Sequence, residues 1–270
     1  MSTVPTTAPP APARARMGLF RTLGYMVQRE VRRTLAAPAL LFPALLVALG
    51  TFFLMSGLFG GYATEFGITD YMAYLVATTL MFGAINTSGG QLVVQDIEAG
   101  YFSKLLTTPT SRLAILLGGM IGDALRAAAI AIVVLVVTLP FTQDGYGTFA
   151  TGIGGALLVI ALTACWGLAY GAISHAIALK TGSAAITQAA FPIFFPFLFL
   201  APSFGPRESM SGWVQAVAQV NPVTYVIEAQ RGLMLTGWDS GQIAAGFIAI
   251  AAMAVATVTL AMLALRSRVS

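Results

Sequence analysis

Six apolar runs dominate this sequence, and each is long enough to cross a lipid bilayer as a helix. The runs cover roughly residues 38–58, 70–93, 113–139, 150–175, 184–203 and 241–265. A bilayer core needs about 20 apolar residues per helix, and hydrophobic residues make up 57% of the chain while charged residues make up 9%. The sequence therefore predicts an all-α polytopic membrane protein with six transmembrane helices rather than a soluble domain.

The distribution of basic residues predicts the orientation of these spans. Eleven of the 14 Lys and Arg residues lie in the N-terminal segment, in the two loops on that same side, or in the C-terminal tail. Only Arg207 and Arg231 lie on the opposite side, and Arg126 falls inside the third run. Because short loops rich in Lys and Arg stay cytoplasmic, we expect a multi-pass plasma-membrane protein with both termini in the cytoplasm. We expect no nucleic-acid partner.

The chain before the first run divides into two parts. Residues 1–16 are rich in Pro, Ala and Thr, which predicts a disordered tail, and the transmembrane domain then covers 17–268. A cleaved signal peptide is the weaker alternative, since the first apolar run starts late and is too long. Residues 17–34 repeat apolar side chains at helical spacing, with most arginines off that face. This pattern predicts an amphipathic interfacial helix, which either binds anionic membrane lipid or only fixes the topology.

The stretch DIEAGYFSKLLTTPTSR, residues 96–112, is the most polar interior segment of the chain. Asp96 can cap a helix whose first turn also holds Glu98. Ile97, Tyr101 and Leu105 then share one stripe, with Phe102 and Leu106 beside it, and Pro109 ends the helix. A helix resting passively on anionic lipid would carry basic residues. The leading carboxylates instead favour a protein partner.

Two charged residues lie within the third run. Asp123 and Arg126 are costly there, so we expect them to pair with each other near the inner end. A proton relay is the alternative, but the other spans offer almost no titratable partners. His175, near the inner end of the fourth run, is interpreted as an interfacial histidine.

Small residues and the single cysteine carry simpler interpretations. The pairs Gly57/Gly61, Gly118/Gly122 and Gly167/Gly171 have the small-xxx-small spacing that predicts close helix packing. With Cys165 alone, neither a disulfide nor a Cys/His metal site is expected.

The fifth run, AAFPIFFPFLFLAP, is rich in phenylalanine and proline. Prolines kink helices, so this span could line a path for an apolar substrate. It could equally face lipid. The candidate path residues are Phe191, Phe194, Phe195 and Phe197.

Two motifs resemble a known family. The first contains Glu98, Gly100, Leu105, Leu106, Thr108, Pro109, Ser111 and Arg112. It is similar to the coupling-helix signature of type-2 exporter permeases of ATP-binding-cassette (ABC) transporters, which include daunorubicin-resistance and polysaccharide-export permeases. The second, NPVTYVIEAQRGLML at 221–235, resembles the segment between the fifth and sixth spans of that family. Ile97 departs from the pattern, since family members often carry an arginine there.

The resemblance implies a permease driven by a separate ATPase. It assigns ATPase coupling to Asp96, Ile97, Glu98, Gly100, Tyr101, Phe102, Leu105, Leu106, Pro109 and Arg112. It also implies two ATPase copies, which bind ATP and Mg, a second permease copy, and a hydrophobic or amphipathic drug-like or lipid-like substrate. This chain has no G-x-x-x-x-G-K-[ST] loop, so we expect no catalytic residue, metal or cofactor in it. The alternatives are a polysaccharide or glycolipid exporter permease of the same family, or an ATP-independent secondary transporter.

The segment 204–240 precedes the last run and is unusually apolar for a loop. The sequence predicts a helix near 213–220, a break at Asn221 and Pro222, and a second helix from Tyr225 to Leu235. The resemblance implies that the two helices dip back into the outer leaflet. Glu228 and Arg231 lie three residues apart, so we expect them to neutralise each other, as scaffolding rather than as a substrate contact.

Overall fold

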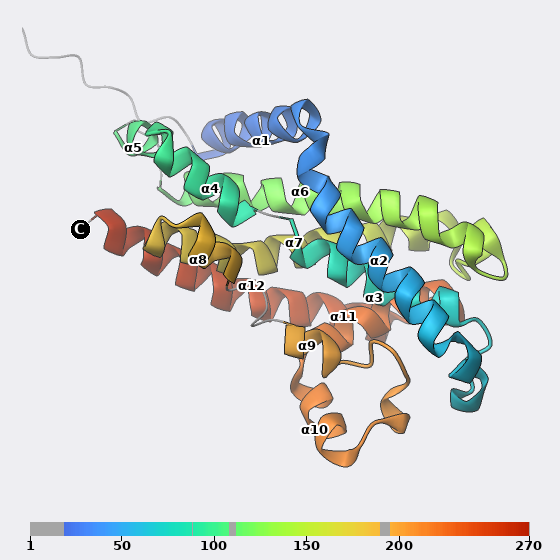
Figure 1. The fold of residues 1–270 in the computed structure, drawn as a ribbon. Coiled ribbons are helices and arrows are strands. Elements are labelled where there is room, and N and C mark those ends of the chain that lie inside the picture. Colours follow the sequence, from blue (N-terminus) through green and yellow to red (C-terminus); the bar gives the residue numbers. More distant parts are fainter. Residues whose placement is uncertain (1–18, 88, 108–111, 190–194, 270) are drawn as a thin grey trace, which may run out of the picture.

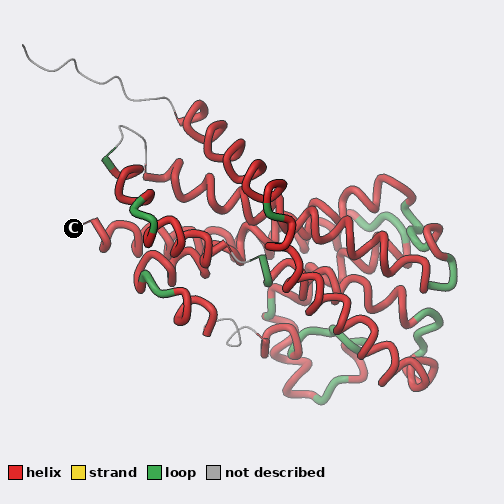
Figure 2. The backbone as a smooth tube through the Cα atoms, turned by 45° about the horizontal axis from the view of Figure 1, so that its top comes forward, coloured by secondary structure: helices red, strands yellow, loops and turns green. Residues whose placement is uncertain are grey.

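The computed structural model describes residues 19–87, 89–107, 112–189 and 195–269. Within these ranges the chain folds into helices joined by short loops, and no strand is present (Figure 2). The predicted all-α class is therefore confirmed. The predicted tail at 1–16 lies outside the described residues.

Four helices are long and apolar enough to cross a membrane. They are α2 (Phe42–Phe59), which follows a short 3₁₀ turn at Pro38–Leu41, α6 (Arg112–Thr138), α7 (Gly152–Thr181) and α12 (Ser240–Val269). Their bounds lie close to those of the first, third, fourth and sixth predicted spans. The strongest apolar runs therefore form the helices expected of them.

The second and fifth predicted spans do not form single helices of span length. The run 70–93 divides into α3 (Tyr71–Ile85) and α4 (Gly89–Glu98). The break follows from the sequence Asn-Thr-Ser-Gly-Gly, since the Asn86 side chain donates to the Phe82 carbonyl at 2.8 Å and ends α3. The fifth run contains α8 (Ala184–Ala189) and α9 (Phe195–Phe199), with residues between them outside the described part. The six-span layout thus appears as four span-length helices and shorter pieces.

Helix α3 lies at the centre of the bundle. Every residue of α3 except Met72 is buried, and the helix packs against α2, α6 and α7 (Figure 1). By contrast, α2 exposes large apolar side chains such as Phe42, Leu46 and Leu54, as expected of a lipid-facing helix.

Several elements gather at one end of the bundle, which we call the α5 end. These are α1 (Leu19–Ala36), α4, α5 (Tyr101–Leu106), α8 and the C-terminal end of α12 (Figure 1). The connections at 60–70 and 139–151 lie at the opposite end. The amphipathic helix predicted at 17–34 corresponds to α1.

The predicted coupling helix differs from the structure. Asp96 does not cap a helix: it lies in the last turn of α4, which ends at Glu98, and α5 begins at Tyr101. Gly100 separates the two with φ of 67°, a left-handed conformation that favours glycine. The segment is therefore a helix, turn and helix.

The segment before α12 follows the sequence prediction closely. Helix α10 covers Gly212–Val220, and α11 covers Pro222–Arg231. The Asn221 side chain caps α11 by accepting from the Val223 N–H at 3.1 Å. A π-helical turn at Gly232–Thr236 extends α11.

Candidate functional site

A buried ion-pair network joins three helices at the α5 end. Arg126 of α6, which is 1% exposed, donates to Asp123 on the same helix at 2.9 Å and to Glu30 of α1 at 3.0 Å. His175 of α7 places Nε2 2.9 Å from the second oxygen of Asp123. The predicted pairing of Asp123 with Arg126 is confirmed. The interpretation of His175 as interfacial is wrong, because it is buried against Asp123.

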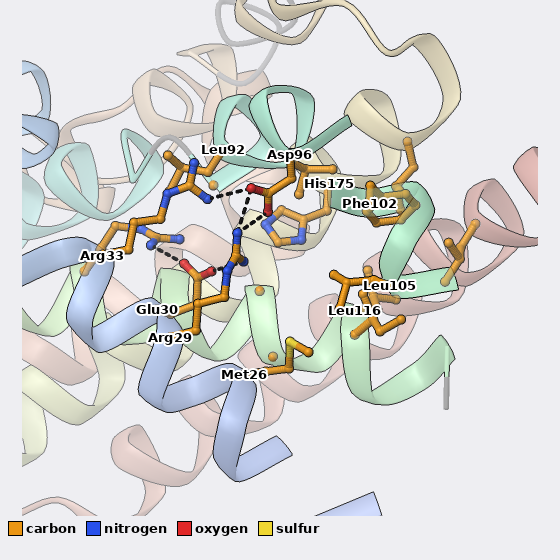
Figure 3. A pocket seen from close by; sticks show the side chains of 18 residues that line it. Met26, Arg29, Glu30, Arg33, Leu92, Asp96, Phe102, Leu105, Leu116 and His175 are labelled. Carbon is orange, nitrogen blue, oxygen red and sulfur yellow. Dashed lines mark hydrogen bonds and ion pairs between the residues drawn. The ribbon is translucent and has the colours of Figure 1, made fainter. Parts of the chain in front are cut away.

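A second, more exposed set of ion pairs connects α1 to the α4–α5 segment. Arg29 donates to both oxygens of Asp96 at 2.7 and 2.8 Å (Figure 3). Its guanidinium stacks 4.4 Å from the centre of the Tyr101 ring. Arg33 adds bonds to Asp96 at 3.3 Å and to Gln95 at 2.9 Å. Burial by itself lowers the pKa of Arg29, but Asp96, together with Glu30 and Tyr101, outweighs burial and raises that pKa overall. Arg29 is therefore firmly cationic.

The two sets meet on adjacent residues of α1. Arg29 donates to the neighbouring Glu30 at 3.0 Å, and Glu30 in turn accepts from Arg126. Continuous ionic contacts thus run from Asp96, beside the turn at Gly100, through α1 to the interior of α6. We call this chain of contacts the α1 linkage.

Glycines make room for the buried charges. A Cβ on Gly89 of α4 or Gly171 of α7 would lie 2.1 or 2.4 Å from a carboxylate oxygen of Asp123. A Cβ on Gly122 would meet Glu30 at 2.8 Å. Asp123 is therefore enclosed by backbone that no larger residue could approach so closely.

The predicted glycine pairs behave in two ways. Gly118 and Gly122 pack against α1, and Gly167 and Gly171 pack against α6, as their spacing predicts. The pair Gly57/Gly61 has nothing within 4 Å of the added Cβ positions. Close packing within this chain is thus confirmed for two of the three pairs.

A pocket with a cavity volume of about 40 Å³, partly open to solvent, lies beside the α1 linkage (Figure 3). Its charged side is formed by Arg29, Glu30 and Asp96, and Phe102 and Leu105 belong to its apolar side. One wall of this amphipathic pocket is therefore the α4–α5 segment itself.

The predicted coupling residues divide into buried and exposed groups. Phe102 and Leu105 are buried within this chain, and Phe102 belongs to an apolar cluster with residues of α6, α7 and α12. Ile97 and Tyr101 are half-buried, and Glu98 is exposed. Pro109 and the side chains of Leu106 and Arg112 lie outside the described residues. The predicted apolar stripe is therefore partly covered by this chain's own helices.

Sequence reasoning missed Arg29, Glu30 and Arg33. Glu30 could have indicated these contacts from the sequence. It is the single acidic residue among the first 64, and arginines lie on both sides of it. In a helix that only lies on anionic lipid, a carboxylate at that position would be repelled by the head groups. An isolated acid in a basic amphipathic helix indicates an internal partner.

Arg231, predicted to pair with Glu228, instead binds backbone. Its guanidinium donates to the carbonyls of Tyr74 at 3.0 Å and Ser203 at 2.9 Å, and also to that of Pro202. Glu228 accepts from Arg207 at 2.8 Å. The predicted pair is wrong because Arg231 turns inward, stacks on the Tyr74 ring, and satisfies carbonyls of an irregular turn.

Comparison with known proteins identifies the class of protein that has this fold. The ABC-2 type transporter family model matches residues 21–235, and the chain belongs to this family. It is 29% identical over 225 residues, 79% of this chain and 77% of the relative, to the daunorubicin resistance ABC transporter permease protein DrrB1 of Streptomyces coeruleorubidus.

Two further relatives are more distant. The putative transport permease ycf38 of Pyropia yezoensis is 26% identical, with 80% of this chain and 74% of the relative covered. The probable doxorubicin resistance ABC transporter permease protein DrrC of Mycobacterium tuberculosis (strain CDC 1551 / Oshkosh) is 25% identical, with 62% and 60% covered. The family resemblance seen in the two sequence motifs is thereby confirmed.

Proposed function

We propose that this chain is the permease subunit of an ABC exporter in the plasma membrane, and that it moves a hydrophobic or amphipathic small molecule. Family membership and two relatives named for drug resistance support this. The chain lacks a phosphate-binding loop of the G-x-x-x-x-G-K-[ST] type. ATP and Mg therefore bind to a separate ATPase, present in two copies with two permeases. The basic α5 end faces the cytoplasm.

The α1 linkage is the observation that carries the proposal. A force applied to the α4–α5 segment reaches Asp96, passes to α1 through the bidentate contact with Arg29, and reaches α6 through Glu30 and Arg126. Charged contacts at these distances are stronger than neutral hydrogen bonds. The linkage thus gives the ATPase-facing segment a direct connection to a membrane span.

The surface left for the ATPase differs from the apolar stripe. Gln95, Glu98, Ala99, Lys104 and Thr107 are the exposed positions of the α4–α5 segment among residues with described side chains. Phe102 and Leu105 support this surface from beneath. We therefore place the docking contact on a mainly polar face that contains Glu98.

The first test reverses one charge on that face. Glu98→Lys should reduce co-purification of the ATPase by about tenfold or more, because a like-charge contact replaces a complementary one. Glu65→Lys is the matched control, since Glu65 is also exposed but lies at the opposite end. Equal co-purification of both variants and wild type would refute docking at Glu98.

The second test separates docking from coupling. Arg29→Ala should leave the ATPase bound but abolish the stimulation of ATP hydrolysis by an apolar drug in reconstituted vesicles. Arg32→Ala, on the exposed face of the same helix, should behave like wild type. The exchange Arg29→Asp with Asp96→Arg should restore part of the stimulation. Full stimulation in Arg29→Ala would contradict the role of the linkage.

A further inference from the structure

A second pocket, here called the apolar pocket, lies between α3, α7, α9, α11 and α12. Its cavity volume is about 100 Å³, it is partly open to the surroundings, and its lining includes Trp166, Tyr170, Phe197, Val223 and Met253. Small-molecule sites in proteins are typically concave and lined mainly by apolar and aromatic side chains. It is separate from the amphipathic pocket, with which it shares no lining residue.

Hydrogen bonds around the apolar pocket hold its walls in place. The Asn221 side chain donates to the Phe197 carbonyl at 2.6 Å and accepts from the Val223 N–H, which ties α9 to the start of α11. At the other end of α11, Arg231 binds the Ser203 carbonyl in the turn after α9. These bonds therefore fix the α9 wall of the pocket against α11.

The wall chemistry restricts what the apolar pocket can bind. Its surface is wholly apolar. The indole N–H of Trp166 is buried and has no acceptor among the described residues, and it is covered rather than presented to the cavity. A charged group entering here would lose hydration without a compensating partner. The aromatic rings of Trp166, Tyr170 and Phe197 instead favour flat apolar rings, which stack or pack edge-on against them.

We propose that the apolar pocket binds a neutral aromatic molecule, or the neutral aromatic part of a transported molecule. This proposal rests on the proposed export function, and it names the chemical class of the exported molecule. Of the predicted path residues that the structure describes, Phe197 lines the pocket and is 47% exposed. Phe195 packs against Phe82 and Phe199 instead, and Phe191 and Phe194 lie outside the described residues.

Trp166 supplies a direct assay for binding. The other two tryptophans, Trp213 and Trp238, are exposed and can be replaced by Phe to leave Trp166 as the single tryptophan, which is excited selectively over the tyrosines at long wavelength. Anthracene, which accepts excitation energy from tryptophan, should quench the purified permease in lipid nanodiscs with a saturable curve. The charged analogue 9-anthracenecarboxylate should produce no saturable quenching. Equal saturable binding of both compounds would overturn the proposed class of ligand.

Two substitutions that fill the pocket locate the binding. Val223→Phe and, from a different helix, Met253→Phe should each weaken anthracene binding by about tenfold. Val255→Phe is the matched control, since Val255 points outward on α12 with 70% exposure. If both pocket variants keep the melting temperature and bind anthracene as wild type does, the proposal is refuted.

The assay uses no ATPase, so it is independent of the coupling tests. Binding that survives in an Arg29→Ala permease would leave this inference standing even if the coupling role failed. Conversely, if the permease shows no saturable anthracene binding but the ATPase is still stimulated by drugs, only the proposed role of the apolar pocket is rejected. In the successful case, Val223→Phe retains the ATPase but loses stimulation by aromatic drugs.

Discussion

Replacing Arg126 with methionine tests how much the Arg126 guanidinium stabilises the buried ion-pair network that it forms with Asp123 and Glu30. Arg126→Met leaves the Asp123 and Glu30 carboxylates, 0% and 5% exposed, without the cation that both contact. Removing one partner of a buried ion pair costs about 3–5 kcal/mol. For a chain of this size that corresponds to a fall of about 6–20 °C in melting temperature. Methionine retains most of the apolar stem, so lost packing contributes little.

Circular dichroism of the purified permease during heating in detergent measures the effect. Arg207→Met is the control: its pair with Glu228 has a similar length, 2.8 Å, but the two side chains are 24% and 36% exposed. Exposed pairs contribute about 0–1 kcal/mol, so the control should lose no more than about 4 °C.

A neutral version of the cluster sharpens the same test. Arg126→Met combined with Asp123→Asn and Glu30→Gln removes every charge of the Arg126 contacts and should recover much of the lost stability. If Arg126→Met melts as Arg207→Met does, or if the triple variant melts lower than Arg126→Met, the charges do not stabilise the bundle as argued.

Three further substitutions test the backbone features around these contacts. Gly89→Ala would place Cβ 2.1 Å from an oxygen of Asp123 and should cost about 1–3 kcal/mol by thermal melting, whereas Gly57→Ala, in open space, should cost nothing measurable. Gly100→Ala, at φ of 67°, should cost about 1–2 kcal/mol and increase proteolysis between α4 and α5; unchanged cleavage would argue against the turn. Arg231→Met should speed hydrogen exchange at residues 200–205, because the two backbone carbonyls of Pro202 and Ser203 in that turn lose their donor, and unaltered exchange would contradict that role.

Apolar length and local spacing predicted the parts of this fold that depend on neighbouring residues. The four span-length helices fall near their predicted positions, and the Asp123–Arg126 pair needs only one turn of α6. The cap at Asn221 and the helix that follows it are equally local. These features are determined by hydropathy, capping and i,i+3 geometry, all of which can be read from one sequence.

The features that sequence reasoning missed depend on contacts between distant segments. Glu30 meets Arg126 across 96 positions, and Arg29 meets Asp96 across 67. No periodicity indicates which helices become neighbours. Arg231 was paired with the nearest acid, although the structure offers it carbonyls of a turn. Gly100 was a visible signal of a helix end, but a continuous apolar stripe across it favoured one helix.

The position of the network along the chain has a consequence for biogenesis. Glu30, Asp123 and Arg126 all precede α7, so they are synthesised before His175. Insertion of α6 carries two charges that each cost about 2.5–3.5 kcal/mol near a helix centre, but they pair within one helix turn, in a span of mean hydropathy 2.3. Helix α6 is therefore apolar enough to insert into the bilayer without help from another helix. The later arrival of α7 encloses Asp123, so nascent chains that end before α7 should already hold α1 against α6.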